Sequence, residues 1–158
     1  MMKGIIFIIF IVLPYILCGQ GIHFQELAFN EAIVKARQEN KFVLLDCYTS
    51  WCGPCKKMAT EVFTLKKAGD YFNDRFVSIK VDMEKGEGPE IAKRFQVGTY
   101  PTFIIFKSDG SIVSRFSGSC DIDGFIAFAE AGINSKVSYD ELAKKYESGK
   151  MKDNEIFT

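Results

Sequence analysis

Helical and strand patterns alternate along this chain, and their order restricts it to the α/β class. Residues 42–48 form an apolar run that is too short for a helix and apolar on both faces, as in a buried central strand. Asp109-Gly110 separates two further strand patterns and strongly favours a hairpin. Since crossover helices imply parallel strands and a hairpin adds antiparallel ones, we expect a mixed central sheet flanked by helices.

The individual elements are predicted from the spacing of apolar residues. Helices are expected at residues 26–40, from residue 53 onward, and at 65–73, 89–95 and 121–133, and strands at 42–48, 76–81, 102–107 and 111–116. The residues expected to be buried in the first two helices are Phe29, Ala32, Ile33 and Ala36, then Cys55, Met58, Ala59 and Val62. We assign residues 20–134 to one globular domain.

The first 19 residues have the pattern of a secretory signal peptide. Lys3 is their only charge and precedes a nearly continuous apolar run over residues 4–18, which is too short to span a bilayer comfortably. Cleavage after Gly19 fits the small residue that such a site needs. Lipidation of Cys18 is less favoured because no small residue directly precedes it, and a retained anchor is the third option. We therefore expect residues 1–19 to direct export to the periplasm or cell envelope.

Residues 135–158 differ in character from the preceding domain. Ser138 and Glu141 form a capping-box pattern, and apolar residues at helical spacing continue up to Gly149. One interpretation is a C-terminal helix that packs on the domain and has a frayed end. The other is the start of a helical extension that continues in a longer parent protein. Both predict a C-terminal helical tail.

The composition excludes several broad classes of protein. Among 158 residues, 20 Lys and Arg balance 20 Asp and Glu, which argues against a nucleic acid or an anionic membrane as partner. The 15 phenylalanines exclude a disordered chain and can supply a substantial core. Five cysteines are too few for a miniprotein built on disulfides, so their spacing matters more than their number.

Cys52 and Cys55 are separated by two residues at the expected start of a helix. Unpaired N–H groups and the helix dipole there would stabilise a thiolate on Cys52, the candidate nucleophile. Cys55, one turn further on and more buried, could close a disulfide with it and expel a substrate held on the first sulfur. Half of a zinc site and a permanent structural disulfide are the alternatives. The zinc option lacks further ligands at a short spacing, so we expect no metal.

Several separated residues complete this pattern. They are Trp51-Cys52-Gly53-Pro54-Cys55-Lys56, then Asp46 on the preceding strand, Lys80 on the next strand, Tyr100-Pro101-Thr102 before the hairpin and Gly118 after it. In these features, over residues 24–133, the chain resembles the thioredoxin superfamily. The resemblance implies a thioredoxin fold, dithiol–disulfide chemistry without a metal or organic cofactor, and disulfide-containing proteins as substrates.

The resemblance also implies roles for the residues around the cysteines. Asp46 would be a buried acid paired with Lys80, and because burial opposes its ionisation it suits a proton acceptor for Cys55. Pro101 would be cis. The residues expected to border the substrate are Tyr100, Pro101, Thr102 and Gly118, with Trp51 as an aromatic lid.

Each of these assignments has a structural alternative. Asp46 could be an inert, hydrogen-bonded acid at a strand end, and Pro101 a trans turn proline. Trp51 could be a core aromatic, and Lys80 a surface lysine. The two remaining cysteines, Cys47 and Cys120, are expected to be a small core residue and a half-exposed thiol. A disulfide between them stays open, because it requires Cα atoms within about 7 Å.

The chain departs from a plain thioredoxin in two segments. Residues 60–75 and the loop at residues 84–88 are both longer, which makes the chain more similar to exported thioredoxin-like domains of the bacterial envelope, including the C-terminal domain of DsbD. Tyr100 stands where the family usually has an aliphatic residue that contacts substrate, so the range of partners is open.

Together these features predict an exported thiol–disulfide oxidoreductase that reduces protein disulfides as a monomer. The Gly53-Pro54 pair resembles that of strongly reducing thioredoxins, whose reduction potential is about −270 mV. Because a reductant in an oxidising compartment must be re-reduced, we expect a membrane electron donor as a partner. The alternatives are a disulfide oxidase or isomerase, and a thioredoxin-fold binding module in which redox activity is incidental.

Overall fold

The computed structural model describes residues 21–135 together with residues 144 and 148. In chain order its elements are α1 (Phe29–Glu39), β1 (Phe42–Tyr48), α2 (Gly53–Lys57), η1 (Met58–Val62), α3 (Lys66–Arg75), β2 (Phe76–Asp82), α4 (Gly88–Arg94), β3 (Thr102–Phe106), β4 (Ile112–Ser117) and α5 (Ile122–Asn134). The alternation of helices and strands is confirmed. Apart from the first two helical segments, every predicted boundary lies within two residues of the observed one.

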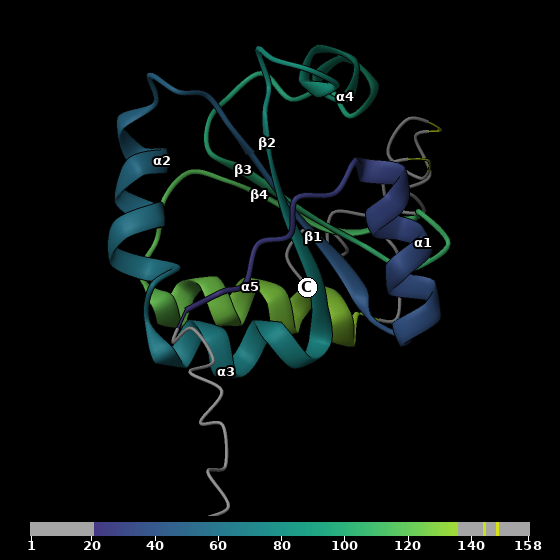
Figure 1. Ribbon diagram of the computed structural model, residues 1–158, viewed down its shortest axis with the longest axis horizontal. Helices are drawn as coiled ribbons and strands as arrows, with labels where there is room; N and C mark the ends of the chain where they lie inside the picture. Colours follow the sequence, from purple (N-terminus) through teal and green to yellow (C-terminus); the bar gives the residue numbers. More distant parts are fainter. Residues whose placement is uncertain (1–20, 136–143, 145–147, 149–158) are drawn as a thin grey trace, which may run out of the picture.

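The four strands form one mixed sheet in the order β2-β1-β3-β4, which crosses the centre of the molecule (Figure 1). β1 pairs parallel with β2 and antiparallel with β3, and β3 pairs antiparallel with β4 across the predicted hairpin. In this register Asp46 of β1 lies beside Lys80 of β2 and Phe103 of β3. The predicted mixed sheet is therefore confirmed, with the apolar run at Phe42–Tyr48 in an interior position.

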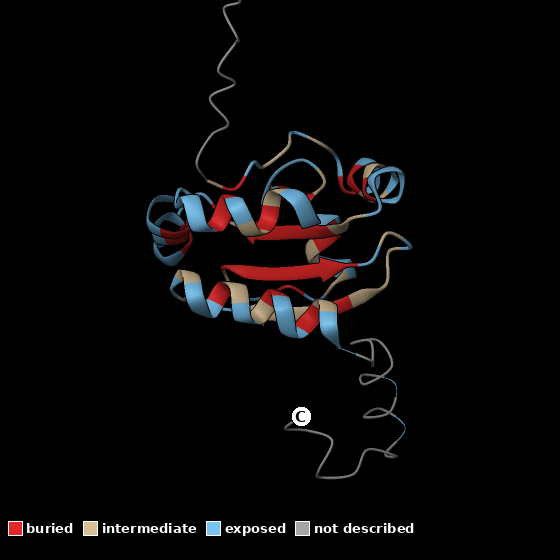
Figure 2. Cartoon of the chain, turned by 90° about the horizontal axis from the view of Figure 1, so that it is seen from below, coloured by how far each residue is buried: buried red, intermediate tan, exposed pale blue. Residues whose placement is uncertain are grey.

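Helices cover both faces of the sheet, so that its strands are buried between two layers (Figure 2). On one face α1 and α4 contribute Phe29 and Ile91 to a cluster that includes Phe106 of β3. On the other face η1, α3 and α5 contribute the second cluster, in which the rings of Phe72 and Phe125 are 4.8 Å apart. Burial on both sides explains why β1 is apolar at nearly every position.

Helix α1 begins three residues later than its apolar spacing predicts. The Gln25 N–H donates to the carbonyl of Ser78 at 2.8 Å, which holds the preceding segment extended along β2. The Ala28 N–H donates to the Glu31 carboxylate at 2.9 Å and so marks the start of the helix. Of the four residues expected inside, Ile33 is only half-buried. The apolar spacing located the helix, while tertiary hydrogen bonds decided where it starts.

The helix after the cysteines contains a π-helical turn that the sequence pattern did not predict. In η1 each backbone hydrogen bond spans five residues instead of four, and the Phe63 N–H donates to the Met58 carbonyl at 2.9 Å. The extra residue turns Phe63 into the core beside Val62. Ala59 is exposed because it lines a cavity that also includes Cys55, so the prediction that Ala59 is buried was wrong.

The segment before α1 is tied to both η1 and β2. The Ile22 N–H donates to the Phe63 carbonyl at 2.7 Å, and the Phe24 and Phe63 rings are 5.0 Å apart. No helix in the part of the chain that the structure describes is long and apolar enough to cross a membrane. The predicted signal peptide at residues 1–19 lies outside the described residues, as does the predicted tail at 135–158 except for residues 135, 144 and 148.

Candidate active site

The two cysteines lie where β1 passes into α2. After the strand ends, the Cys52 N–H donates to the Thr49 carbonyl at 3.2 Å, and Cys52 becomes the N-cap residue of α2. Its Sγ accepts a hydrogen bond from the Cys55 N–H at 3.1 Å. Cys52 and Cys55 are joined in a disulfide, with their Cα atoms 5.3 Å apart. The Pro54 ring fits the first turn, where its missing N–H costs no helical bond.

The relative burial of Cys52 and Cys55 differs from what the sequence pattern predicted. Cys52 is 3% exposed and Cys55 is 7% exposed, whereas the pattern predicted an accessible Cys52 and a more deeply buried Cys55. In this disulfide form the Cys52 sulfur is bonded to Cys55 and also accepts a hydrogen bond from the Cys55 N–H in the first turn of α2. The expected order of exposure is thus wrong for the disulfide form.

Asp46 is an acid buried in the middle of the sheet. Its side chain is 5% exposed, and its Oδ1 has no hydrogen-bond partner among the described residues. Burial raises the pKa of the Asp46 carboxyl to about 7, while the positive charge of Lys80 acts in the opposite direction. Lys80 is exposed on the neighbouring strand, and the two form no ion pair within the described part of the chain. The expected proximity is present, but direct pairing is not.

Asp46 and Cys55 line the same cavity, which has a volume of about 830 Å³. The Cys52 side chain does not belong to its lining. Of the two sulfurs, Cys55 is therefore the one on the side of the buried acid. This arrangement places a carboxyl with a pKa close to neutral on the same cavity as the Cys55 side chain.

The predicted substrate loop lies at the start of β3. The Tyr100–Pro101 peptide bond is cis, which confirms that prediction. The Gly118 N–H donates to the Pro101 carbonyl at 2.9 Å, and Gly118 has a φ of 117°, a conformation that favours glycine. Thr102 is fully buried, and its Oγ1 donates to the Thr99 carbonyl at 2.8 Å. The sequence thus located a loop whose internal hydrogen bonds hold it in one shape.

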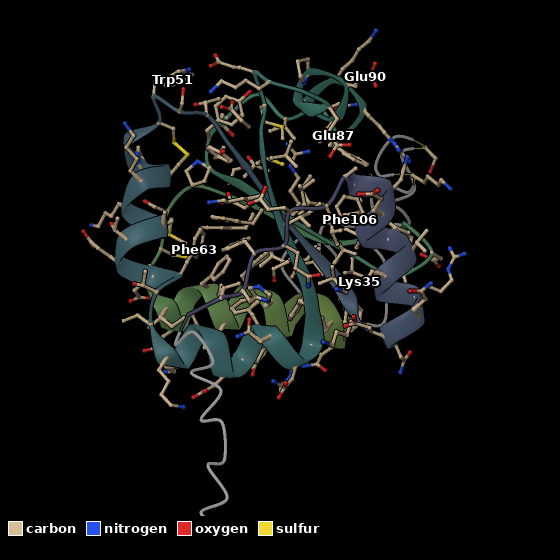
Figure 3. All side chains as sticks on the ribbon, viewed as in Figure 1. Lys35, Trp51, Phe63, Glu87, Glu90 and Phe106 are labelled. Carbon is tan, nitrogen blue, oxygen red and sulfur yellow. A yellow bond between two sulfur atoms is a disulfide. The ribbon has the colours of Figure 1, made fainter. Side chains whose placement is uncertain are left out.

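Trp51 projects from the surface at the outer end of α2 (Figure 3). Its side chain is 64% exposed, so the alternative of a core aromatic is excluded. The indole N–H donates to Glu84 Oε1 at 3.0 Å, and the ring meets Tyr100 edge to face at a centroid distance of 6.0 Å. Glu84 was missed by sequence reasoning. The only signal was its place in the lengthened loop, which indicates no particular partner.

Cys47 and Cys120 are free thiols, so the open question of a disulfide between them is answered against it. Cys47 is buried on β1, and burial raises the pKa of its thiol. Cys120 is half-buried just before α5. Within the described residues, no three side chains of the His, Cys, Asp and Glu types gather as a metal site would require.

Comparison with known proteins defines the class to which this fold and disulfide belong. The model of the family described as Thioredoxin matches residues 20–131, so the chain belongs to the thioredoxin family. Thioredoxin Y2, chloroplastic, from Arabidopsis thaliana is 33% identical over 108 residues. The match covers 68% of this chain and 61% of that relative, so the chain spans less than two thirds of its length.

Two solved bacterial structures are similar over nearly their whole length. The solution structure of a candidate disulphide isomerase from Bacteroides thetaiotaomicron is 43% identical, with a TM-score of 0.66, and the match covers 74% of this chain and 97% of that one. The oxidised C-terminal domain of DsbD from Neisseria meningitidis is 26% identical, with a TM-score of 0.57, and the match covers 70% and 98%. The fold is thus the thioredoxin fold, and the DsbD domain is among its structural neighbours.

Proposed function

We propose that this chain is an exported thiol–disulfide oxidoreductase that reduces protein disulfides through Cys52 and Cys55. The observation that carries this proposal is the placement of Cys55 and Asp46 on one cavity while Cys52 caps α2. Such an arrangement separates a nucleophile from a resolving thiol that has its own proton acceptor.

The reaction begins with the reduced protein. The Cys52 thiolate, stabilised by the Cys55 N–H, attacks one sulfur of a substrate disulfide, and the other substrate sulfur leaves as a thiolate. Cys55 then gives its proton to Asp46 and attacks the Cys52 sulfur. The Cys52–Cys55 disulfide forms and the second substrate thiolate leaves. Two electrons have passed from the protein dithiol to the substrate disulfide.

The surface around Cys52 supports a protein substrate. The exposed Trp51, held by Glu84 and packed against Tyr100, offers an apolar rim beside the cis Tyr100–Pro101 bond. In this proposal a segment of the substrate lies along this rim, bordered by Thr102 and Gly118. Export then requires a membrane electron donor to restore the dithiol, and the protein acts as a monomer without a cofactor.

An insulin assay tests the proposed activity. With dithiothreitol as the electron source, the purified protein should speed the reduction of insulin disulfides well above the rate with dithiothreitol alone, because the Cys52 thiolate is pre-positioned at a helix start. The precipitation of free insulin B chain reports the reaction. A rate equal to the dithiothreitol background would contradict the proposal.

A disulfide isomerase is the second candidate, and the observation in its favour is the similarity to the Bacteroides thetaiotaomicron structure. The reduction potential of the Cys52–Cys55 pair separates the two. We expect about −270 mV, since the Gly53-Pro54 pair resembles that of reducing thioredoxins. The measurement is equilibration of the protein in glutathione or thioredoxin redox buffers. A potential of about −180 mV would instead favour an isomerase, and one of about −120 mV an oxidase.

A further inference from the structure

The cavity beside the active site has the size and lining of a binding site for a small organic molecule. Its volume of about 830 Å³ lies in the range of ligand pockets. Ile22, Phe24 and Phe63 belong to its lining, and the Phe24 ring lies 5.0 Å from the ring of Phe63, which follows η1 and is labelled in Figure 3. It therefore extends well beyond Cys55 and Asp46, toward the extended segment that precedes α1.

Two residues that line this cavity each have a buried polar side-chain atom without a hydrogen-bond partner among the described residues. These atoms are Oδ1 of Asp46, on a side chain 5% exposed, and Oγ1 of Thr49, on a residue 1% exposed. Both residues belong to the cavity lining. A buried polar atom without a hydrogen bond is costly, so a polar occupant that either atom reaches after a small side-chain movement would be stabilised.

The exposed part of the lining is positively charged. Lys56 on α2 and Lys80 on β2 are both exposed and both belong to the cavity lining. Neither ammonium group forms an ion pair or hydrogen bond within residues 21–135. Among the described residues that line the cavity, Asp46 is the only acid, and its side chain is buried. Two unpaired cations over an apolar interior match a ligand with an anionic head and an apolar body.

We propose that this cavity binds an amphipathic organic anion. Its anionic group lies between Lys56 and Lys80, and its apolar body packs against Ile22, Phe24 and Phe63. A bound molecule would also exclude water from Asp46 and Cys55. If the proposed disulfide reduction is correct, an occupied cavity slows the step in which Cys55 loses its proton.

Binding is tested with three ligands that share one alkyl chain and differ in the head group. Decanoate, decanol and decylammonium are titrated into the oxidised protein below their critical micelle concentrations. Calorimetry measures the affinity of each ligand, and changes in amide chemical shifts locate its binding site. Decanoate should bind at least about tenfold more tightly than the other two, since only its head group complements the lysines. The shifts should centre on residues 21–24 and Thr49.

Two variants test the assignment of the site. Lys56→Gln combined with Lys80→Gln should weaken decanoate binding about tenfold, whereas Lys35→Gln combined with Lys93→Gln, on α1 and α4, removes the same charge elsewhere and should change it by less than twofold. Ala59→Trp places a large ring at the exposed side of the cavity and should abolish binding. Because calorimetry needs no turnover, binding by a protein that fails to reduce insulin would refute only the proposed function.

Several results would overturn the inference itself. Equal or tighter binding of decanol or decylammonium would exclude an anion site. Chemical-shift changes centred on α1 would place the ligand elsewhere. Equal losses of decanoate affinity in the two double lysine variants would do the same. Decanoate at about five times its Kd for the unsubstituted protein should slow insulin reduction by that protein about fivefold and slow the Lys56→Gln, Lys80→Gln protein, which binds about tenfold more weakly, by less than twofold. Binding without such slowing would remove the proposed link to Cys55.

Discussion

Replacing Cys52 with serine should abolish insulin reduction, a loss of at least about 1,000-fold, because the attacking group is a thiolate and a serine hydroxyl stays protonated at neutral pH. Cys55→Ser should also stop turnover, but at a later step. The Cys52 thiolate remains and attacks, and no second sulfur expels the substrate. A covalent complex should therefore accumulate, visible on non-reducing gels and by mass spectrometry.

The matched control for this pair is Cys120→Ser, which removes a half-buried free thiol and should leave the rate unchanged. The disulfide form buries both active-site cysteines almost equally, so their exposure does not show which one is the nucleophile. The comparison of Cys52→Ser with Cys55→Ser decides this question. If complexes accumulate with Cys52→Ser and not with Cys55→Ser, Cys55 is the nucleophile and the proposed order of attack is wrong.

The second large effect concerns Asp46 and the pH dependence of stability. The pKa of this carboxyl is raised to about 7 in the fold, above its ordinary value of 3.8, so the folded protein holds a proton that the unfolded chain has lost. Stability from this group is therefore highest at low pH and falls as the pH rises from about 4 to about 7. A pKa difference of about 3 units corresponds to a loss of about 4 kcal/mol, at 1.36 kcal/mol per unit.

Asp46→Asn removes this titration. In urea unfolding of the oxidised proteins, the variant should gain stability relative to the parent between pH 4 and pH 8, by up to about 4 kcal/mol. Asp109→Asn is the control, since hydrogen bonds from Ser111 lower the pKa of Asp109 and its exposed position makes the effect small and opposite in sign. Parallel pH profiles for the parent and Asp46→Asn would show that this carboxyl does not titrate in that range.

The same variant tests the proposed proton transfer. Asparagine cannot accept the Cys55 proton, so resolution of a preformed mixed disulfide should slow at least about tenfold at neutral pH. Single-turnover kinetics isolate this step. A gain in stability with no change in the rate would leave Asp46 as a buried acid that takes no part in the reaction.

The sequence predicted most of the fold because local and tertiary preferences agree there. The strand at Phe42–Tyr48 was located to the residue, since a run apolar on both faces fits only an interior strand. The cis peptide bond before Pro101 was predicted from the family resemblance and is confirmed. In both cases a short stretch of sequence contains the information that decides the structure.

Features decided by distant residues were not predicted. The start of α1 depends on a hydrogen bond between Gln25 and Ser78, which are far apart in the sequence. Glu84 meets Trp51 only because the lengthened loop brings it there. The cavity beside Cys55 requires residues 21–24 to lie against η1, and no spacing within that segment indicates such a contact.

The π-helical turn in η1 has a consequence for how the active-site helix is joined to the rest of the molecule. One extra residue advances the angular phase of a helix by about 100°, a little more than a quarter of a turn. That rotation presents Phe63 to Ile22 and Phe24. With regular α-helical phase, the helix that starts at the cysteines would direct a different side chain there, and the segment before α1 would lose its anchor. The irregularity therefore determines which residue after the active-site helix contacts the N-terminal edge of the domain.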